Sequence, residues 1–289
     1  MLNEEKLPVA WRCGRFYFDW SKRHKPVVMG ILNVTPDSFS DGGKFFSVNA
    51  AIEQAHHMIQ AGAEIIDIGG ESTRPGAQEI SVQEELDRIL PVIEVLLKEN
   101  IAISVDTYKP QTMEVVAHLG VDMINDIWGL RKPEAIETVA KFPQLGLCLM
   151  HMQNSPFDMQ IKPHYDDVLQ EVDRFFAARL QALSIAKIES IRIVIDPGLG
   201  FGKTPEHNLR LINRLDSLIH FNCPILMGAS RKSTLRKITG DHLSHMTVPS
   251  VVAGILAADR GAHILRVHDV PETIAALKVR QAIMVEGLS

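Results

Sequence analysis

Short apolar segments recur along the chain, and each is followed by a turn of glycine and polar residues and then by a stretch with helical spacing. The segments are continuously apolar rather than alternating, which is typical of strands that are buried on both faces of a parallel sheet. We therefore predict eight strands. They cover residues 27–32, 65–68, 101–105, 123–124, 145–150, 193–195, 225–227 and 264–267.

The stretches between these segments carry apolar residues at every third or fourth position, as amphipathic helices do. The predicted helices cover residues 50–61, 82–98, 110–119, 133–140, 167–188, 206–215 and 272–286. Pro110, Pro133 and Pro271 each suit a first helical position, where no backbone N–H is required. Residues 234–260 are long enough for two further helices.

Alternating strands and helices predict an α/β fold with a parallel sheet. Eight units within 289 residues favour closure into a (β/α)8 TIM barrel over an open doubly wound sheet. We expect one domain that spans residues 1–289. Residues 1–25 precede the first unit, and we expect residues 11–20 to form a strand or hairpin that closes the bottom of the barrel.

Composition and charge narrow the possible functions. The net charge of −5 argues against binding of bulk nucleic acid, which requires a basic surface. The acidic N-terminus lacks the apolar core of a signal peptide, and the longest apolar run, residues 251–258, is too short to span a bilayer. Three cysteines without close spacing suit a reducing compartment. We expect a cytoplasmic protein that binds neither nucleic acid nor membranes.

Polar residues end every predicted strand. They are Asn33, Asp67, Asp106, Asn125 with Asp126, His151, Asp196, the segment 228–232, and Arg266 with His268. In a barrel the C-terminal strand ends converge on one mouth, so these groups would face a shared pocket. At any single Asp, Asn or Ser the alternative is a cap on the following helix. His, Lys and Arg do not cap helix N-termini, which favours a site.

The charges at these strand ends suggest a ligand with two different ends. Asp106, Asn125 and Asp196 form an acidic and amide-rich side, and a carboxylate there can accept two parallel N–H bonds from a cyclic guanidine edge. Lys232, Arg266 and His268 form a cationic side. The substrate would therefore join a donor-rich heterocycle to a phosphoryl or carboxyl group. Ser230 to Ser233 would open a helix as an anion site, although a solvated basic turn is the alternative.

Three glycine-containing segments follow predicted strands. Residues 35–43 and 69–77 are longer than minimal connections, and we interpret them as covers of the site, with Phe39 available to a ligand. Simple connection is the alternative for both. Residues 198–204 resemble a phosphate-binding loop, but Pro197 stands where that motif requires glycine. We expect this backbone to make room for a flat ligand on which Phe201 stacks.

Eight motifs occur in the order that is typical of one family. They are residues 29–43 (MGILNVTPDSFSDGG), 67–76 (DIGGESTRPG), 104–107 (SVDT), 125–126 (ND), 150–152 (MHM), 196–203 (DPGLGFGK), 230–233 (SRKS) and 266–270 (RVHDV). From about Pro26 to its end the chain closely resembles the dihydropteroate synthases of the pterin-binding barrel family. The resemblance implies a transferase of folate biosynthesis. Such an enzyme joins 6-hydroxymethyl-7,8-dihydropterin diphosphate to p-aminobenzoate and releases pyrophosphate.

The resemblance also implies roles for individual residues. It implies that the pterin is held by Asp106, Asn125, Met150, Asp196, Phe201, Gly228 and Lys232. It implies that the diphosphate is held by Asn33, Arg266 and His268, with Mg²⁺ as cofactor on Asn33. It implies that p-aminobenzoate is held by Phe39, Thr73, Arg74, Pro75 and Ser230. Asp106, Lys232 and Arg266 would be catalytic, and the family implies a homodimer.

Two positions depart from the family pattern, and two other functions compete. Trp128 stands where we expect a small residue, and Asn154 where we expect glycine. A pterin-dependent methyltransferase would share the Asp and Asn groups, and a non-catalytic pterin-binding protein would need no diphosphate cations. Neither requires residues 230–232, the pair Arg266 and His268, or the two covering segments, so the synthase is preferred.

Overall fold

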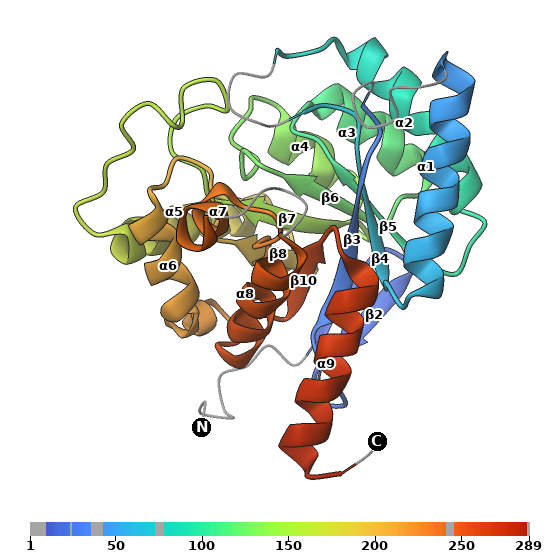
Figure 1. The fold of residues 1–289 in the computed structure, drawn as a ribbon. Coiled ribbons are helices and arrows are strands. Elements are labelled where there is room, and N and C mark those ends of the chain that lie inside the picture. Colours follow the sequence, from blue (N-terminus) through green and yellow to red (C-terminus); the bar gives the residue numbers. More distant parts are fainter. Residues whose placement is uncertain (1–9, 24, 36–42, 73–77, 241–245, 288–289) are drawn as a thin grey trace.

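Eight parallel strands form a sheet that closes on itself (Figure 1). The computed structural model describes residues 10–23, 25–35, 43–72, 78–240 and 246–287. The strands are β3 (Val27–Asn33), β4 (Ile65–Gly69), β5 (Ala102–Asp106), β6 (Met123–Asp126), β7 (Gly146–Met150), β8 (Ile193–Asp196), β9 (Leu226–Met227) and β10 (Ile264–Val267). Their order is β8-β7-β6-β5-β4-β3-β10-β9, and a parallel bridge between Ile195 and Ile225 joins the two edges. The predicted TIM barrel is confirmed.

Several strands extend further than the apolar pattern predicted, because their parallel pairing continues through the polar residues. Gly69 pairs with Asp106, and Asp106 pairs with Asn125. Met150 likewise pairs with Asp196. These polar side chains are therefore held by the sheet itself and not by flexible turns.

Helices surround the barrel, and a large apolar cluster fills the space between them and the sheet. They are α1 (Gly43–Gln60), α2 (Val82–Leu96), α3 (Pro110–Leu119), α4 (Ala135–Ala140), α5 (Val168–Ile185), α6 (Pro205–Asn213), α7 (Ser233–Thr239), α8 (Thr247–Asp259) and α9 (Val270–Val285). Two 3-10 helices, η3 (Ser190–Arg192) and η4 (Leu215–Phe221), precede β8 and β9. The two helices expected in residues 234–260 are α7 and α8. None of the helices in the described ranges is long and apolar enough to cross a membrane.

The ends of the helices follow the local sequence. Pro110 begins α3, as predicted, and Pro271 lies in the first turn of α9. Asp167 precedes α5, and its carboxylate accepts from two backbone N–H groups of the first turn. The prediction for Pro133 was wrong, because Glu134 adopts a left-handed conformation (φ +67°) and α4 begins at Ala135.

A β-hairpin closes the bottom of the barrel, as predicted. The strands β1 (Ala10–Cys13) and β2 (Phe16–Asp19) are antiparallel. The side chains of Trp11, Cys13 and Phe18 pack with residues of the barrel interior. Figure 1 shows β2 at the lower end of the barrel, opposite the end where α1 begins.

The barrel interior changes from apolar to polar along its axis. The lower interior packs around the hairpin and consists of Val27, Met29, Ile65, Ala102, Met123, Cys148, Val194, Leu226 and Ile264. Side chains alternate across a strand, so the next inward position lies two residues further on. Those positions are Ile31, Asp67, Ser104, Asn125, Met150, Asp196, Gly228 and Arg266, and five of them are polar. The strand geometry thus gathers the polar residues in one layer below the mouth.

Candidate functional site

Asp67 is the centre of the polar layer. Its carboxylate is fully buried and accepts hydrogen bonds from Ser104 Oγ (2.6 Å), Asn125 Nδ2 (3.1 Å) and Arg266 Nε (2.6 Å). Two donors come from the neighbouring strands β5 and β6 on one side of β4, and the third comes from β10, two strands away on the other side. Asp67 therefore fixes the orientation of two residues that the sequence analysis assigned to substrate binding.

Arg266 connects the acidic and the basic residues of the mouth. Its Nη2 atom donates to Asp106 Oδ2 at 2.8 Å while its Nε atom donates to Asp67. Burial, assisted by the nearby charge of Asp67, raises the pKa of Asp106 to about 7, although Arg266 opposes this shift. Asp106 pairs with Arg266 and does not cap α3, since Lys109 occupies the cap position. Asp106 is thus a carboxyl group that can gain or lose a proton near neutral pH.

Asp196 presents one carboxylate oxygen to the backbone and the other to the interior. Its Oδ1 atom accepts from the backbone N–H of Gly198 at 2.7 Å. A Cβ atom on Gly228 would lie 4.0 Å from Oδ2, so the glycine keeps space open beside that oxygen. Burial raises the pKa of Asp196, while the bond from Gly198 and the charge of Lys232 lower it. The open oxygen can accept hydrogen bonds from a ligand.

Lys232 reaches the same space from the other side. Its Nζ atom lies 4.6 Å from the centre of the Phe201 ring, a cation–π contact. Burial lowers the pKa of Lys232 to about 8, and the charge of Asp196 limits the shift. Gly200 lies directly below, where a Cβ atom would be 3.4 Å from Lys232 Cδ. A planar ligand between Asp196 and Phe201 would therefore meet a cation and an aromatic face.

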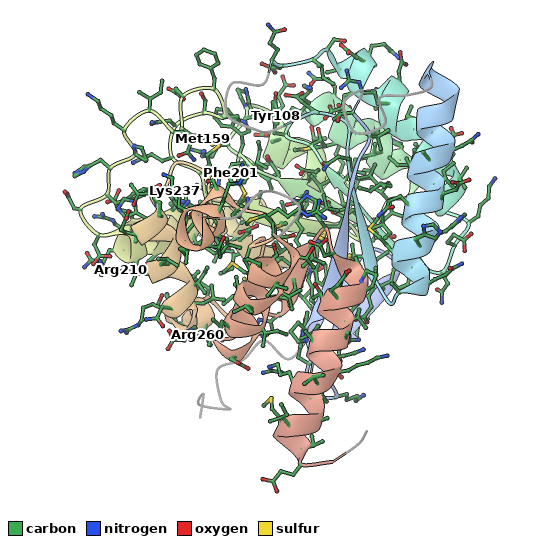
Figure 2. All side chains as sticks on the ribbon, viewed as in Figure 1. Tyr108, Met159, Phe201, Arg210, Lys237 and Arg260 are labelled. Atoms are coloured by element: carbon green, nitrogen blue, oxygen red, sulfur yellow. The ribbon has the colours of Figure 1, made fainter. Side chains whose placement is uncertain are left out.

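An apolar wall lines the mouth next to these groups. Tyr108, Ile127, Met150, Met152 and Met159 are buried together, and Trp128 and Phe201 pack against them. Figure 2 shows Tyr108, Met159 and Phe201 at the same end of the barrel. This wall suits a flat heterocycle, because sulfur and aromatic groups adapt to an extended π-face.

Ser230 and His268 form a pair at the basic side. Ser230 Oγ lies 3.0 Å from His268 Nδ1 and accepts from the backbone N–H of His268 at 3.2 Å. Burial, together with the charges of Arg266 and Arg231, lowers the pKa of His268 to about 3. The sequence analysis counted His268 as a cation, and this was wrong, because the ring is neutral near pH 7. It can still donate one N–H bond to an anion.

Arg231 is committed to an internal ion pair. Its guanidinium binds the carboxylate of Asp269 through Nη2 (2.6 Å) and Nε (3.2 Å), and its backbone N–H donates to Ser250 Oγ. The residue adopts a left-handed conformation with φ +55°. These contacts hold the strained turn that places Ser230 on one side and Lys232 on the other.

Asn33 lies at the end of β3, near the acidic side of the mouth. A Cβ atom on Gly69 would lie 3.7 Å from Asn33 Oδ1 and 3.6 Å from Asp106 Cβ, so this glycine keeps the space between them open. Within the described ranges, no group of three or more His, Cys, Asp or Glu residues is arranged to hold a metal ion.

Some of the residues named in the sequence analysis lie outside the described part of the chain or away from the polar layer. Phe39, Thr73, Arg74 and Pro75, which the resemblance assigned to p-aminobenzoate, lie outside the described residues. Asn154 has φ +61°, which explains why glycine suits this position and why asparagine can replace it.

Capping explains only part of the strand-end pattern. Asp126 accepts from the backbone N–H groups of Trp128 and Leu130, both at 2.7 Å, and thus serves the local turn. Asp67 and Ser104 belong to the site, but the sequence analysis expected Asp67 only as one of the polar strand ends facing the mouth and gave Ser104 no role. A polar residue within an apolar strand, as in Ile-Ile-Asp-Ile, is the signal that could have found them.

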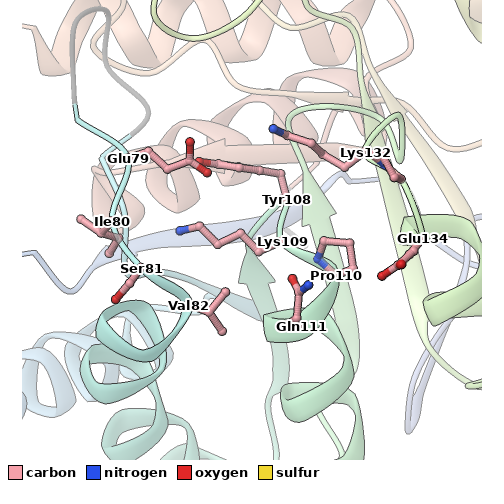
Figure 3. Close-up of a pocket in the computed structure, with 11 residues that line it drawn as sticks. Glu79, Ile80, Ser81, Val82, Tyr108, Lys109, Pro110, Gln111, Lys132 and Glu134 are labelled. Carbon is pink, nitrogen blue, oxygen red and sulfur yellow. The ribbon is translucent and has the colours of Figure 1, made fainter.

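A separate pocket of about 500 Å³ opens at the outer rim of the mouth (Figure 3). Its lining comes from three segments, which are residues 79–82, 108–111 and 132–134. Glu71 supports this rim, because it accepts from Tyr108 Oη (2.8 Å) and from Lys109 Nζ. None of the residues predicted for substrate binding lines this pocket.

The chain was compared with known proteins. The sequence model of a family described as pterin binding enzyme matches residues 29–268. The dihydropteroate synthase of Escherichia coli (strain K12) is 49% identical over 258 residues, which cover 89% of this chain and 91% of that protein.

Solved structures agree with this result. The Xanthomonas albilineans dihydropteroate synthase with 4-aminobenzoic acid has a TM-score of 0.89 and 44% identity, and the match covers 96% of this chain and 98% of that chain. The Burkholderia cenocepacia dihydropteroate synthase complexed with 7,8-dihydropteroate has a TM-score of 0.87 and 42% identity, with 97% and 98% covered.

Proposed function

Because the chain belongs to the pterin-binding enzymes and its relatives are dihydropteroate synthases, we propose that it joins 6-hydroxymethyl-7,8-dihydropterin diphosphate to p-aminobenzoate. The products are 7,8-dihydropteroate and pyrophosphate. The observation that carries the proposal is the interior arrangement of Asp196, Asn125 and Lys232 beside an apolar wall, with Arg266 adjacent.

The pterin would occupy the space between Asp196 and Phe201. Its ring N–H groups form a donor edge that matches the open carboxylate oxygen of Asp196. Asn125 and Asp106 would bind further polar atoms of the ring, and Lys232 an acceptor atom. Met150 supplies an apolar surface to this space, and Gly228 leaves room in it.

We propose that the diphosphate binds to Arg266, His268 and Asn33, which come from the ends of the adjacent strands β10 and β3. Arg266 supplies the cation, and neutral His268 donates a single hydrogen bond. Asn33 would hold a Mg²⁺ ion through its side-chain oxygen, which the absence of a side chain at Gly69 leaves accessible, because Mg²⁺ often uses few protein ligands. When bound, Mg²⁺ would neutralise charge on the diphosphate.

The reaction requires no nucleophilic side chain. The bond between the pterin methylene carbon and the diphosphate oxygen breaks, and its electron pair leaves with the diphosphate. The electron-rich ring, held by Asp106 and Asp196, stabilises the resulting cation. The lone pair of the p-aminobenzoate nitrogen then forms the new C–N bond, and the nitrogen loses one proton. Ser230, with Phe39, Thr73, Arg74 and Pro75, would shape the p-aminobenzoate side.

We further propose a homodimer in the cytoplasm. Val248, Val252 and Leu256 lie four residues apart on α8 and are 72%, 52% and 43% exposed, so they form an apolar stripe that a second copy could cover. The three cysteines are all free, which suits a reducing compartment. Sedimentation equilibrium would test the dimer.

Activity is tested with the purified protein, the pterin diphosphate, p-aminobenzoate and Mg²⁺. We expect pyrophosphate and dihydropteroate in equal amounts, with release dependent on Mg²⁺. Binding of the pterin without turnover would show a non-catalytic binding protein. Methyl transfer from methyltetrahydrofolate, without pyrophosphate release, would show the methyltransferase instead.

A further inference from the structure

Lys203 ends the glycine-rich segment after β8, and its ammonium group is enclosed by carbonyl oxygens. The residue is 3% exposed. Its Nζ atom donates to the backbone oxygens of Gly198 (3.0 Å), Phe201 (3.0 Å) and His151 (3.2 Å), and it lies 2.9 Å from His151 Nδ1. Within the described ranges Lys203 forms no ion pair with a carboxylate. It is therefore a buried donor whose partners are almost all backbone groups.

Two of the residues whose carbonyl oxygens bind Lys203 also form part of the proposed pterin site. The peptide N–H of Gly198 donates to Asp196 Oδ1 at 2.7 Å, and the peptide N–H of Phe201 donates to the Gly198 oxygen at 3.2 Å. The ring of Phe201 faces Lys232. Lys203 thus binds the carbonyl oxygens of Gly198, whose N–H bonds the Asp196 carboxylate, and of Phe201, whose ring contacts Lys232.

The segment passes very close to the residues that follow β7. A Cβ atom on Gly198 would lie 2.0 Å from the His151 oxygen, and one on Gly202 would lie 2.8 Å from Gln153 Cβ. Both glycines have positive φ values, +68° and +64°. Without Lys203 the Gly198 oxygen would keep only the Phe201 N–H, and the oxygens of Phe201 and His151 would lose this donor. A buried carbonyl that loses a hydrogen bond is costly.

Arg192 provides a natural counterpart at the other end of the barrel. It is 2% exposed and also donates to backbone oxygens, through Nε to Leu145 (2.8 Å) and through Nη2 to Phe142 (2.8 Å) and Val139 (3.3 Å). Its own carbonyl accepts from Trp11 of the bottom hairpin. Arg192 has the same kind of local contacts as Lys203 but lies away from the proposed site.

We propose that Lys203 is a positioning residue for pterin recognition, which acts by fixing the peptides of Gly198 and Phe201 so that Asp196 and Phe201 face the ligand. The proposal rests on the proposed function, since it requires that the pterin binds at Asp196. Lys203 itself does not touch the ligand. Its loss displaces both groups together and so lowers pterin affinity more than it affects the other substrate.

The test compares Lys203→Met with Arg192→Met in the full chain. Calorimetry gives the Kd of 6-hydroxymethyl-7,8-dihydropterin diphosphate, steady-state kinetics give KM for p-aminobenzoate, and thermal unfolding gives Tm. Both variants lower Tm. For Lys203→Met we expect the pterin Kd to rise roughly 10- to 100-fold and KM for p-aminobenzoate to stay within about threefold. For Arg192→Met we expect neither constant to change more than about threefold.

The outcomes separate the two proposals. If the wild-type protein binds no pterin diphosphate, the proposed function fails. If the wild type binds it and Lys203→Met binds it as well as Arg192→Met does, the positioning role is wrong. Lys203→Gln retains two donors and should lose less affinity than Lys203→Met, which a purely steric effect would not produce. If neither Lys203 variant folds while Arg192→Met does, Lys203 serves the fold as a whole and the proposal is overturned.

Discussion

At the bottom of the barrel, Asp122 is fully buried and its carboxylate is fully bonded, whereas at the mouth Asp106 and Asp196 are buried with fewer bonds. Asp122 accepts from Arg15 N (2.9 Å), Nε (3.0 Å) and Nη2 (2.8 Å) and from Ile103 N (2.9 Å). Its hydrogen bond with Arg15 raises the pKa of that guanidinium. Burial instead raises the pKa of both mouth carboxyls.

The difference shows that the two ends of the barrel serve stability and ligand binding separately. A buried carboxylate is stable when both of its oxygens accept hydrogen bonds, and Asp122 at the bottom of the barrel meets that condition. The mouth keeps acceptors such as Asp196 Oδ2 open, which costs stability but leaves capacity for a substrate. In barrel enzymes the N-terminal face serves stability and the C-terminal face serves function, and the two sets of carboxylates follow that rule.

Asp122→Ala should give the largest effect and should act on stability alone. The substitution leaves the Ile103 N–H buried without a partner and removes the ion pair with Arg15. We expect the free energy of unfolding in urea to fall by about 3–5 kcal/mol. The Kd of the pterin diphosphate should stay within about threefold in the folded variant. A large loss of affinity would contradict the separation of the two ends.

Asp196→Ala should give the opposite pattern. Loss of the charged acceptor should weaken pterin binding about 100-fold by calorimetry. Its unfolding free energy should fall less than that of Asp122→Ala, because only the Gly198 N–H loses its protein partner. Unchanged pterin affinity would refute the role of Asp196.

Asp106 should make stability depend on pH. Its folded pKa of about 7 lies above the ordinary value of 3.8, so between these values the folded protein holds a proton that the unfolded chain has lost. This contribution favours folding at low pH and is lost as the pH rises through 7. Asp106→Asn removes it, so the variant should gain on the order of 2–3 kcal/mol relative to wild type between pH 5 and pH 8.

Urea unfolding at several pH values measures this difference. The control is Asp166→Asn, whose side chain is 98% exposed and whose stability should run parallel to wild type. If the unfolding free energies of Asp106→Asn and wild type also change in parallel with pH, burial does not raise the pKa of Asp106, and the proposed contrast between mouth and bottom is wrong.

Trp128→Phe should give the smallest effect. Of the three tryptophans, Trp11 and Trp20 belong to the bottom cluster and Trp128 to the mouth wall. Binding of the pterin should change the fluorescence of the wild-type protein, and Trp128→Phe should abolish that change while Kd stays within about threefold. Trp20→Phe should preserve the change. A signal that follows Trp20 would place the ligand-induced response at the bottom instead.

The fold could be predicted from the sequence because buried parallel strands leave continuous apolar segments and the helices between them leave a periodic pattern. The polar strand ends pointed to the mouth for the same reason. The central role of Asp67 could not be predicted, since it depends on Ser104, Asn125 and Arg266 meeting across the barrel. The neutral state of His268 likewise depends on burial beside Arg266, which no spacing in the sequence reveals.

The three cysteines make it possible to compare how fast different parts of the barrel open. Cys13 lies in the bottom hairpin, Cys148 in the barrel interior, and Cys223 just before the short β9 at the seam where the sheet closes. Burial raises the pKa of all three thiols. A thiol reagent can reach each cysteine only when its surroundings open, so each labelling rate reports the opening of one part of the barrel. The order in which the three cysteines are labelled would reveal which part of the barrel opens first.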